Sequence, residues 1–391
     1  MTTRITLIGA LAVLAAVGPI AAQTPPPPTD SLTAKDTKTL ITPFVTPGYT
    51  PEQGALLSLG ALISFRPSPF YKIGGKDLVQ RSTIVFNGSY STTKAITANA
   101  KLTSFLLGDQ LRVYADVTVK NMPDHYFGVG YEAGKKPEGD STTAYQRQSF
   151  NFLPKFLWRV RPAVLIGPTF DINITTASRV SPGMTADPYY QQFGAKNKNS
   201  GVGAVVQYDS RDVVANAWSG VYVNAQAMGY FDALGSQNIY QVYDLDYRQY
   251  RQLGRKGRTL AWTVRTRFTN GEVPWAELSL LASSNDLRGY RQGRYRDKAM
   301  AYGIAEYRHQ LTSTTRASGL GRNGFVAWMG VGSLAPSVGE LHDILPNWGV
   351  GYRFEVQPRM SVRMDVGFGK EYKTSGDKYL PSVYFSFAEA F

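Results

Sequence analysis

The sequence predicts an all-β protein: one antiparallel, sixteen-stranded barrel that spans a membrane. Apolar and polar residues alternate along nearly the whole chain, and successive side chains of a strand point to opposite faces of a sheet. The alternating segments run about 10 to 15 residues, as a tilted membrane strand requires, rather than the usual 5 or 6. Beyond the N-terminal segment, no apolar run approaches the roughly 20 residues of a spanning helix. Without such a helix, only a closed barrel can satisfy the hydrogen bonds of the backbone in lipid.

Residues 1–22 have the pattern of a secretory signal peptide. Arg4 precedes an apolar run over residues 5–17, and small residues lead up to Ala22, after which we expect cleavage. The alternative is a membrane anchor, which Pro19 disfavours because it breaks the apolar run early.

A proline-rich periplasmic linker is expected over residues 23–38, extended and solvated, and the barrel over residues 39–391. In residues 359–368, for example, polar or small residues alternate strictly with apolar ones. The number of strands is even, as bacterial barrels require. The predicted strands are 39–49, 53–66, 81–92, 94–106, 109–121, 143–160, 161–178, 199–211, 219–233, 238–251, 257–270, 296–312, 322–334, 347–357, 359–371 and 379–391.

The charge balance is basic, with 42 Lys and Arg against 29 Asp and Glu. These basic residues are scattered and often share a strand face with acids, which argues against nucleic acid as a partner. A solvated lumen, outer-membrane lipids and lipopolysaccharide are the expected surroundings.

No group of residues has the pattern of an active site. The histidines His125, His309 and His342 lack metal-ligand spacing, and the chain has no cysteine. No nucleophile elbow accompanies Asp124 beside His125. The sequence therefore predicts no catalytic residue, no metal, no cofactor and no enzymatic activity.

Four stretches resemble the BamA/TamA superfamily of outer-membrane barrels, the bacterial surface antigen family, in the same order along the chain. They are YDSRD, with Tyr208, Asp209, Arg211 and Asp212, followed by WSG at 218–220; LRGY at Leu287, Arg288, Gly289 and Tyr290; EYR at 306–308; and GVGYRFEV at 349–356 with RMDVGFG at 363–369. The resemblance extends over nearly everything after residue 39. It implies a Gram-negative outer-membrane location.

The resemblance also implies a role for two further segments, one loop and the last strand. Residues 271–295, after the eleventh strand, correspond to a loop that folds back into the lumen with the LRGY motif at its tip. Phe385, Phe387 and Phe391 correspond to a terminal recognition strand, read by the barrel assembly machinery during biogenesis, and were expected on one strand face.

Three departures from the family pattern stand out. The residues before the barrel leave no room for the periplasmic POTRA domains that family members usually carry. Gly330 stands where the thirteenth strand of relatives has an acid that pairs with the loop arginine, and Ala282 and Ser283 replace a usual Gly-Gly.

Without that acid, Arg288 needs another partner in the lumen, because a shielded guanidinium requires a carboxylate or several carbonyls. Glu306 is the predicted partner, since it shares the inward face of its strand with Arg308, and Asp365 is the next candidate. The alternative is that Arg288 lies in an exposed loop.

Prolines mark the seam between the first and last strands. Pro43 and Pro47 lie in the first strand and Pro381 in the last, and proline donates no ladder hydrogen bond. We expect a thin closing ladder that resembles the lateral gate of the family. A permanently closed seam is equally compatible with these prolines.

The resemblance implies that the barrel inserts or translocates polypeptides, or is the membrane component of a multiprotein machine with a periplasmic or lipoprotein partner. The alternatives are a passive porin-like channel with a loop plug, and a barrel partner of a separate lipase-like passenger. The sequence names neither the substrate nor the partner.

Overall fold

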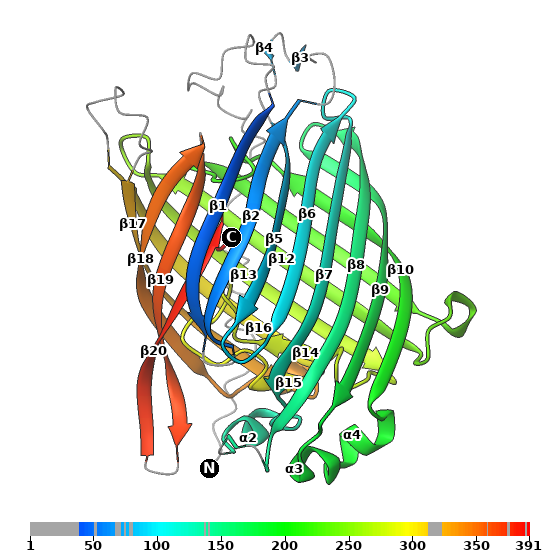
Figure 1. The fold of residues 1–391 in the computed structure, drawn as a ribbon. Helices are drawn as coiled ribbons and strands as arrows, with labels where there is room; N and C mark the ends of the chain where they lie inside the picture. The colour runs from blue at the N-terminus through cyan, green and yellow to red at the C-terminus, as the bar shows by residue number, and fades with distance from the viewer. Residues whose placement is uncertain are drawn as a thin grey trace, which may run out of the picture.

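In the computed structural model, sixteen strands form one antiparallel sheet that curls into a nearly closed barrel (Figure 1). The structure describes residues 39–391 except 51–52, 67–71, 74–75, 78–80, 137, 140, 312–322, 358, 374–375 and 388. The predicted signal peptide and linker lie outside the described residues.

Each barrel strand pairs with the strands before and after it in the chain. The barrel strands are β1 (Leu40–Thr50), β2 (Gly54–Phe65), β5 (Ser82–Ser91), β6 (Ile96–Leu106), β7 (Leu111–His125), β8 (Ala144–Arg161), β9 (Val164–Ser178), β10 (Lys196–Asp209), β11 (Gly220–Tyr230), β12 (Tyr240–Gln252), β13 (Arg258–Gly271), β16 (Ala299–Gln310), β17 (Asn323–Ala335), β18 (Leu345–Gln357), β19 (Met360–Lys373) and β20 (Gly376–Phe387). All sixteen predicted segments coincide with these strands. The fold class is confirmed.

Because side chains alternate along each strand, every strand has one lumenal face and one outer face. In β16, Ile304, Glu306 and Arg308 are buried, whereas Tyr307 between them is exposed. In β17, Met329 has an exposed fraction of 68%. Large apolar side chains exposed in this way suit the hydrocarbon core of a bilayer, and charged side chains on the other face suit a polar interior.

One end of the barrel is covered by loops, and we call it the capped end. It carries α2 (Tyr131–Gly134), α3 (Pro182–Thr185), α4 (Pro188–Phe193) and the short pair β14 (Ser279–Leu281) and β15 (Tyr295–Asp297) (Figure 1). Trp275 is fully buried beneath them and donates a 2.9 Å hydrogen bond from its indole Nε1 to the Gly194 carbonyl. No helix in the described part of the chain is long and apolar enough to cross a bilayer.

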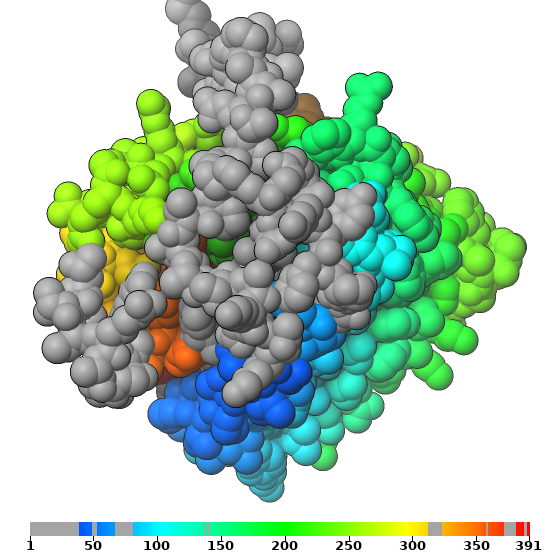
Figure 2. Space-filling view, turned by 90° about the horizontal axis from the view of Figure 1, so that it is seen from above, coloured from blue at the N-terminus to red at the C-terminus, as the bar shows by residue number. Residues whose placement is uncertain are grey.

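The first and last strands lie side by side (Figure 1). Figure 2, which looks onto the end opposite the capped end, shows the colours running around the barrel in chain order from blue through cyan, green and yellow to orange. The hydrogen-bonded strand order nevertheless begins at β1 and ends at β20. Within the described residues no ladder joins these two edges, although each pairs fully with its other neighbour. Pro43 and Pro47 lie on the β1 edge and Pro381 lies on the β20 edge.

The last strand is shorter than the sequence predicts. β20 ends at Phe387 instead of residue 391, and the chain then turns into the lumen (Figure 1). Phe391 is 7% exposed, whereas Phe385 on the strand is 38% exposed, so the two rings do not share a face. Guanidinium groups in the lumen bind this terminal segment and compete with the outer ladder for it.

Candidate functional site

The loop between β13 and β16, residues 272–298, has its LRGY tip buried against strands of the barrel. Leu287, Arg288 and Tyr290 are buried. Gly289 has a φ of +116°, and a Cβ added there would lie 2.3 Å from the Phe368 carbonyl carbon. Only glycine combines this backbone conformation with so close an approach to β19.

Arg288 is held by two carboxylates. Its Nη1 donates a 2.8 Å hydrogen bond to Asp365 Oδ2, and its Nη2 pairs with Glu306. All three side chains are fully buried. The guanidinium carbon also lies 3.6 Å from the ring centroid of Trp328, in cation–π geometry.

The surroundings of Gly330 in β17 explain why the acids that bind Arg288 come from other strands. A Cβ there would lie 2.7 Å from Ile304 Cγ1 and 2.8 Å from Asn347 Oδ1, so no acidic side chain fits without movement of the wall. Glu306 on β16 and Asp365 on β19 instead reach Arg288 from either side of β17 and β18.

Arg288 belongs to a larger group that we call the lumenal charge cluster. Its members are the arginines Arg288, Arg308, Arg353 and Arg363 and the acids Glu306, Asp365 and Glu389. Asp365 also accepts hydrogen bonds from Arg353 (2.6 Å) and Arg363 (3.2 Å), and Glu306 from Arg308 (2.9 Å). Four guanidinium groups against three carboxylates leave a formal charge of +1.

Arg353, Arg363 and Glu389 were not predicted from the sequence as members of this cluster. Arg353 and Arg363 occupy inward positions in the two glycine-rich stretches that carried the family resemblance, so their alternation could have identified them. Nothing in the pattern around Glu389 predicts that it leaves the strand.

The loop tip also contacts the last strand. The Gly289 N–H donates a 3.0 Å hydrogen bond to the Tyr384 hydroxyl of β20, and that hydroxyl donates to the Tyr290 carbonyl over 3.3 Å. The Tyr290 hydroxyl in turn donates to the Pro346 carbonyl, at 2.7 Å. A movement of β20 away from the barrel wall would therefore break contacts with the loop tip.

The YDSRD motif forms a separate structure at the opposite end of the barrel. Asp209 accepts hydrogen bonds from Arg112 (2.6 Å) and Arg211 (2.8 Å). Tyr208 points to the other face of the sheet and takes no part in this pairing. Asp212 accepts from Arg359, at 2.6 Å, in the β18–β19 turn.

That last contact joins distant hairpins. Arg359 also donates to the Asn216 carbonyl, at 2.9 Å, and its guanidinium carbon lies 3.4 Å from the Trp218 ring centroid. The loop between β10 and β11 is thus bound to the β18–β19 turn.

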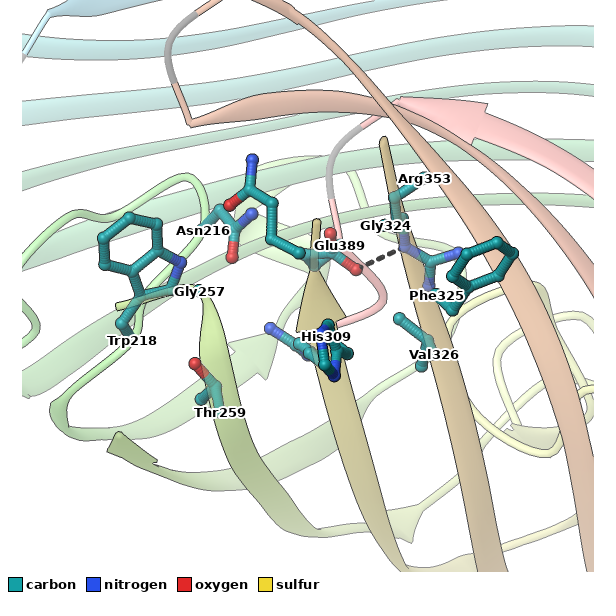
Figure 3. Close-up of a pocket in the computed structure, with 12 residues that line it drawn as sticks. Asn216, Trp218, Gly257, Thr259, His309, Gly324, Phe325, Val326, Arg353 and Glu389 are labelled. Carbon is teal, nitrogen blue, oxygen red and sulfur yellow. Dashed lines mark hydrogen bonds and ion pairs between the residues drawn. The ribbon is translucent and has the colours of Figure 1, made fainter. Parts of the chain in front are cut away.

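A small pocket lies at this opposite end (Figure 3). Trp218 and Asn216 lie on one side of it, His309 and Val326 on the strands β16 and β17, and the paired Arg353 and Glu389 on another side (Figure 3). No group of three possible metal-ligating side chains occurs within the described residues.

Glu277 in the loop is a second buried acid, near Asp171, Arg267 and Arg147. Burial and the nearby Asp171 carboxylate raise the pKa of Glu277 to about 7, against a usual 4.5, while the two arginines oppose the shift. The folded state therefore holds a proton that the unfolded state releases between these pH values, so stability falls as the pH rises from about 4.5 to 7.

We expect the loop to be more resistant to protease at pH 5 than at pH 8. A tenfold difference in the cleavage rate within residues 272–298 would correspond to roughly 1.4 kcal/mol. Glu277→Gln should remove most of this pH dependence. An unchanged pH profile in that variant would assign the effect to another group.

Comparison with known proteins identifies the fold. The Omp85 superfamily domain matches residues 82–387. BamA from Haemophilus ducreyi lacking POTRA domains 1–3 is similar in structure, with a TM-score of 0.54 and 13% identity over 90% of this chain and 70% of that chain. CdiB from Escherichia coli has a TM-score of 0.54 and 11% identity over 90% of this chain and 62% of that chain. This chain thus spans less than two thirds of CdiB. No curated protein sequence matches it significantly.

Proposed function

Because the chain belongs to the Omp85 superfamily of outer-membrane barrels, we propose that it inserts polypeptides into the outer membrane or moves them across it. In this proposal the capped end faces the outside of the cell, the opposite end faces the periplasm, and a periplasmic or lipoprotein partner delivers the polypeptide. This process needs no covalent chemistry, because the polypeptide changes its location and no bond is made or broken.

One observation carries the proposal. The edges of β1 and β20 lie side by side without a ladder in the described residues, and the loop tip is hydrogen-bonded to Tyr384 on one of these edges. Strand edges that no ladder covers are templates for pairing with another chain. Separation of this seam would expose both edges to an incoming strand and withdraw a contact from the loop at the same time.

A disulfide across the seam tests the proposal, and the absence of native cysteines makes the test clean. Gly48 on β1 suits one cysteine, because a Cβ built there lies 3.8 Å from Phe385 Cδ2 on β20. We expect the oxidised Gly48→Cys, Phe385→Cys variant to lose activity and to recover it on reduction. The matched control is Tyr243→Cys with Phe268→Cys, which lie opposite each other in the β12–β13 ladder.

Activity is measured as the insertion or protection of a polypeptide in proteoliposomes, with a substrate identified by co-purification from native outer membranes. Both oxidised variants should remain folded. Full activity of the seam-locked barrel would contradict the proposal and favour a permanently closed seam.

A further inference from the structure

The segment Glu389–Phe391, which we call the tail, is bound inside the barrel by three kinds of contact. Glu389 Oε2 accepts a 2.7 Å hydrogen bond from Arg353 Nε. The Phe391 carbonyl accepts a 3.0 Å hydrogen bond from Arg308 Nη2, and the Phe391 ring centroid lies 4.9 Å from the Arg308 guanidinium carbon. An acidic side chain, a main-chain oxygen and an aromatic ring are therefore recognised separately.

The tail lies beside the pocket of Figure 3, which Arg308, Arg353 and Glu389 themselves line. The Phe391 ring packs in an apolar cluster that includes Ala217 and Tyr250. The site thus combines an apolar contact surface for a ring with two guanidinium groups that line the pocket.

The two arginines have hydrogen-bonding capacity that the tail does not use. Arg308 Nη1 and Arg353 Nη2 are buried and have no hydrogen-bond partner among the described residues. Each arginine is at most 6% exposed. Buried donors without acceptors are destabilising. The site therefore favours a ligand that brings hydrogen-bond acceptors in addition to those that the tail supplies.

We propose that this pocket binds a segment of another polypeptide, one with an acidic residue followed two positions later by an aromatic residue, and that the tail is its resident competitor. The identity of that polypeptide as cargo rests on the proposed function, but the binding itself does not. Exchange of one segment for the other preserves the carboxylate on Arg353 and the ring on the apolar contact surface, so displacement leaves no buried arginine without a partner.

Binding of a labelled peptide to the full chain in detergent tests the site. The peptide YFSFAEAF has the sequence of residues 384–391 and is followed by fluorescence anisotropy. The tail variant Glu389→Gln with Phe391→Ala should bind it about tenfold more tightly than the wild type does, because a charge-assisted hydrogen bond of the competitor is lost. Adding Arg353→Gln should cancel that gain, and a peptide with Gln in place of Glu should bind about tenfold more weakly.

Arg251→Gln is the control, because Arg251 is exposed near the same end and does not line the pocket. Each variant must first migrate as a heat-modifiable folded barrel. If Arg353→Gln fails to fold, Arg353→Lys keeps the charge beside Asp365 but lacks the planar fork, and it should also remove most of the gain of the tail variant.

Equal binding by the wild type and the tail variant, or binding that ignores the peptide carboxylate, would overturn the proposal. The peptide assay is independent of transport. A seam-locked barrel that stays active while peptide binding follows the pattern above would refute the proposed function alone.

Discussion

Asp365→Asn is expected to destabilise the barrel by about 3 to 5 kcal/mol, the largest effect of any single change in the lumenal charge cluster. Asp365 is fully buried and accepts hydrogen bonds from Arg288, Arg353 and Arg363. Removing its charge leaves four arginines facing two carboxylates, so the formal charge of the cluster rises from +1 to +2. Three buried guanidinium groups lose their shared partner.

The temperature at which the folded, fast-migrating form disappears on a gel measures this loss. Asp244→Asn is the matched control, because Asp244 also pairs with an arginine across neighbouring strands, at 2.7 Å from Arg265, but in a pair whose arginine side chain is 38% exposed. Exposed pairs contribute about 0 to 1 kcal/mol. Similar shifts for the two variants would mean that the cluster does not stabilise the barrel through Asp365.

Arg288→Ala should loosen the loop at a smaller cost, about 1 to 3 kcal/mol. Both acids keep other partners, since Glu306 retains Arg308 and Asp365 retains Arg353. The loss comes from the stacking on Trp328 and from the space that the side chain leaves. We expect more protease cleavage within residues 272–298 and a larger single-channel conductance in planar bilayers.

Arg288→Lys is the control for charge alone, because lysine keeps the charge but lacks the planar fork that reaches two carboxylates. It should fall between the wild type and Arg288→Ala. Unchanged cleavage and conductance in Arg288→Ala would show that the loop is held in place without its arginine.

A charge exchange separates a simple pair from a shared cluster. If Arg288 paired with Glu306 alone, Arg288→Glu combined with Glu306→Arg would recover part of the loss. In the structure, however, the new carboxylate would face Asp365 and the new guanidinium would face Arg308. We therefore expect no recovery, and substantial recovery would argue against the contact with Asp365.

The sequence by itself determined the barrel. Alternation with a period of two is local information, because a strand of about ten residues displays its apolar and polar faces without reference to its neighbours. The sixteen strands and the inward position of Glu306 follow from that pattern. With Gly330 in place of the acid that the family resemblance implies, Glu306 and Asp365 were the predicted partners of Arg288.

Only the tertiary structure decided how those residues meet. Arg288 and Asp365 are 77 positions apart, and their contact depends on the curvature of the sheet and on the path of a loop that no period describes. The inward turn after Phe387 is a competition between ladder hydrogen bonds and lumenal arginines. Alternation continues through the tail and therefore predicts that the last strand continues to the end. The sequence pattern shows which residues are apolar, but it does not show that Arg308 and Arg353 lie where they can bind the tail.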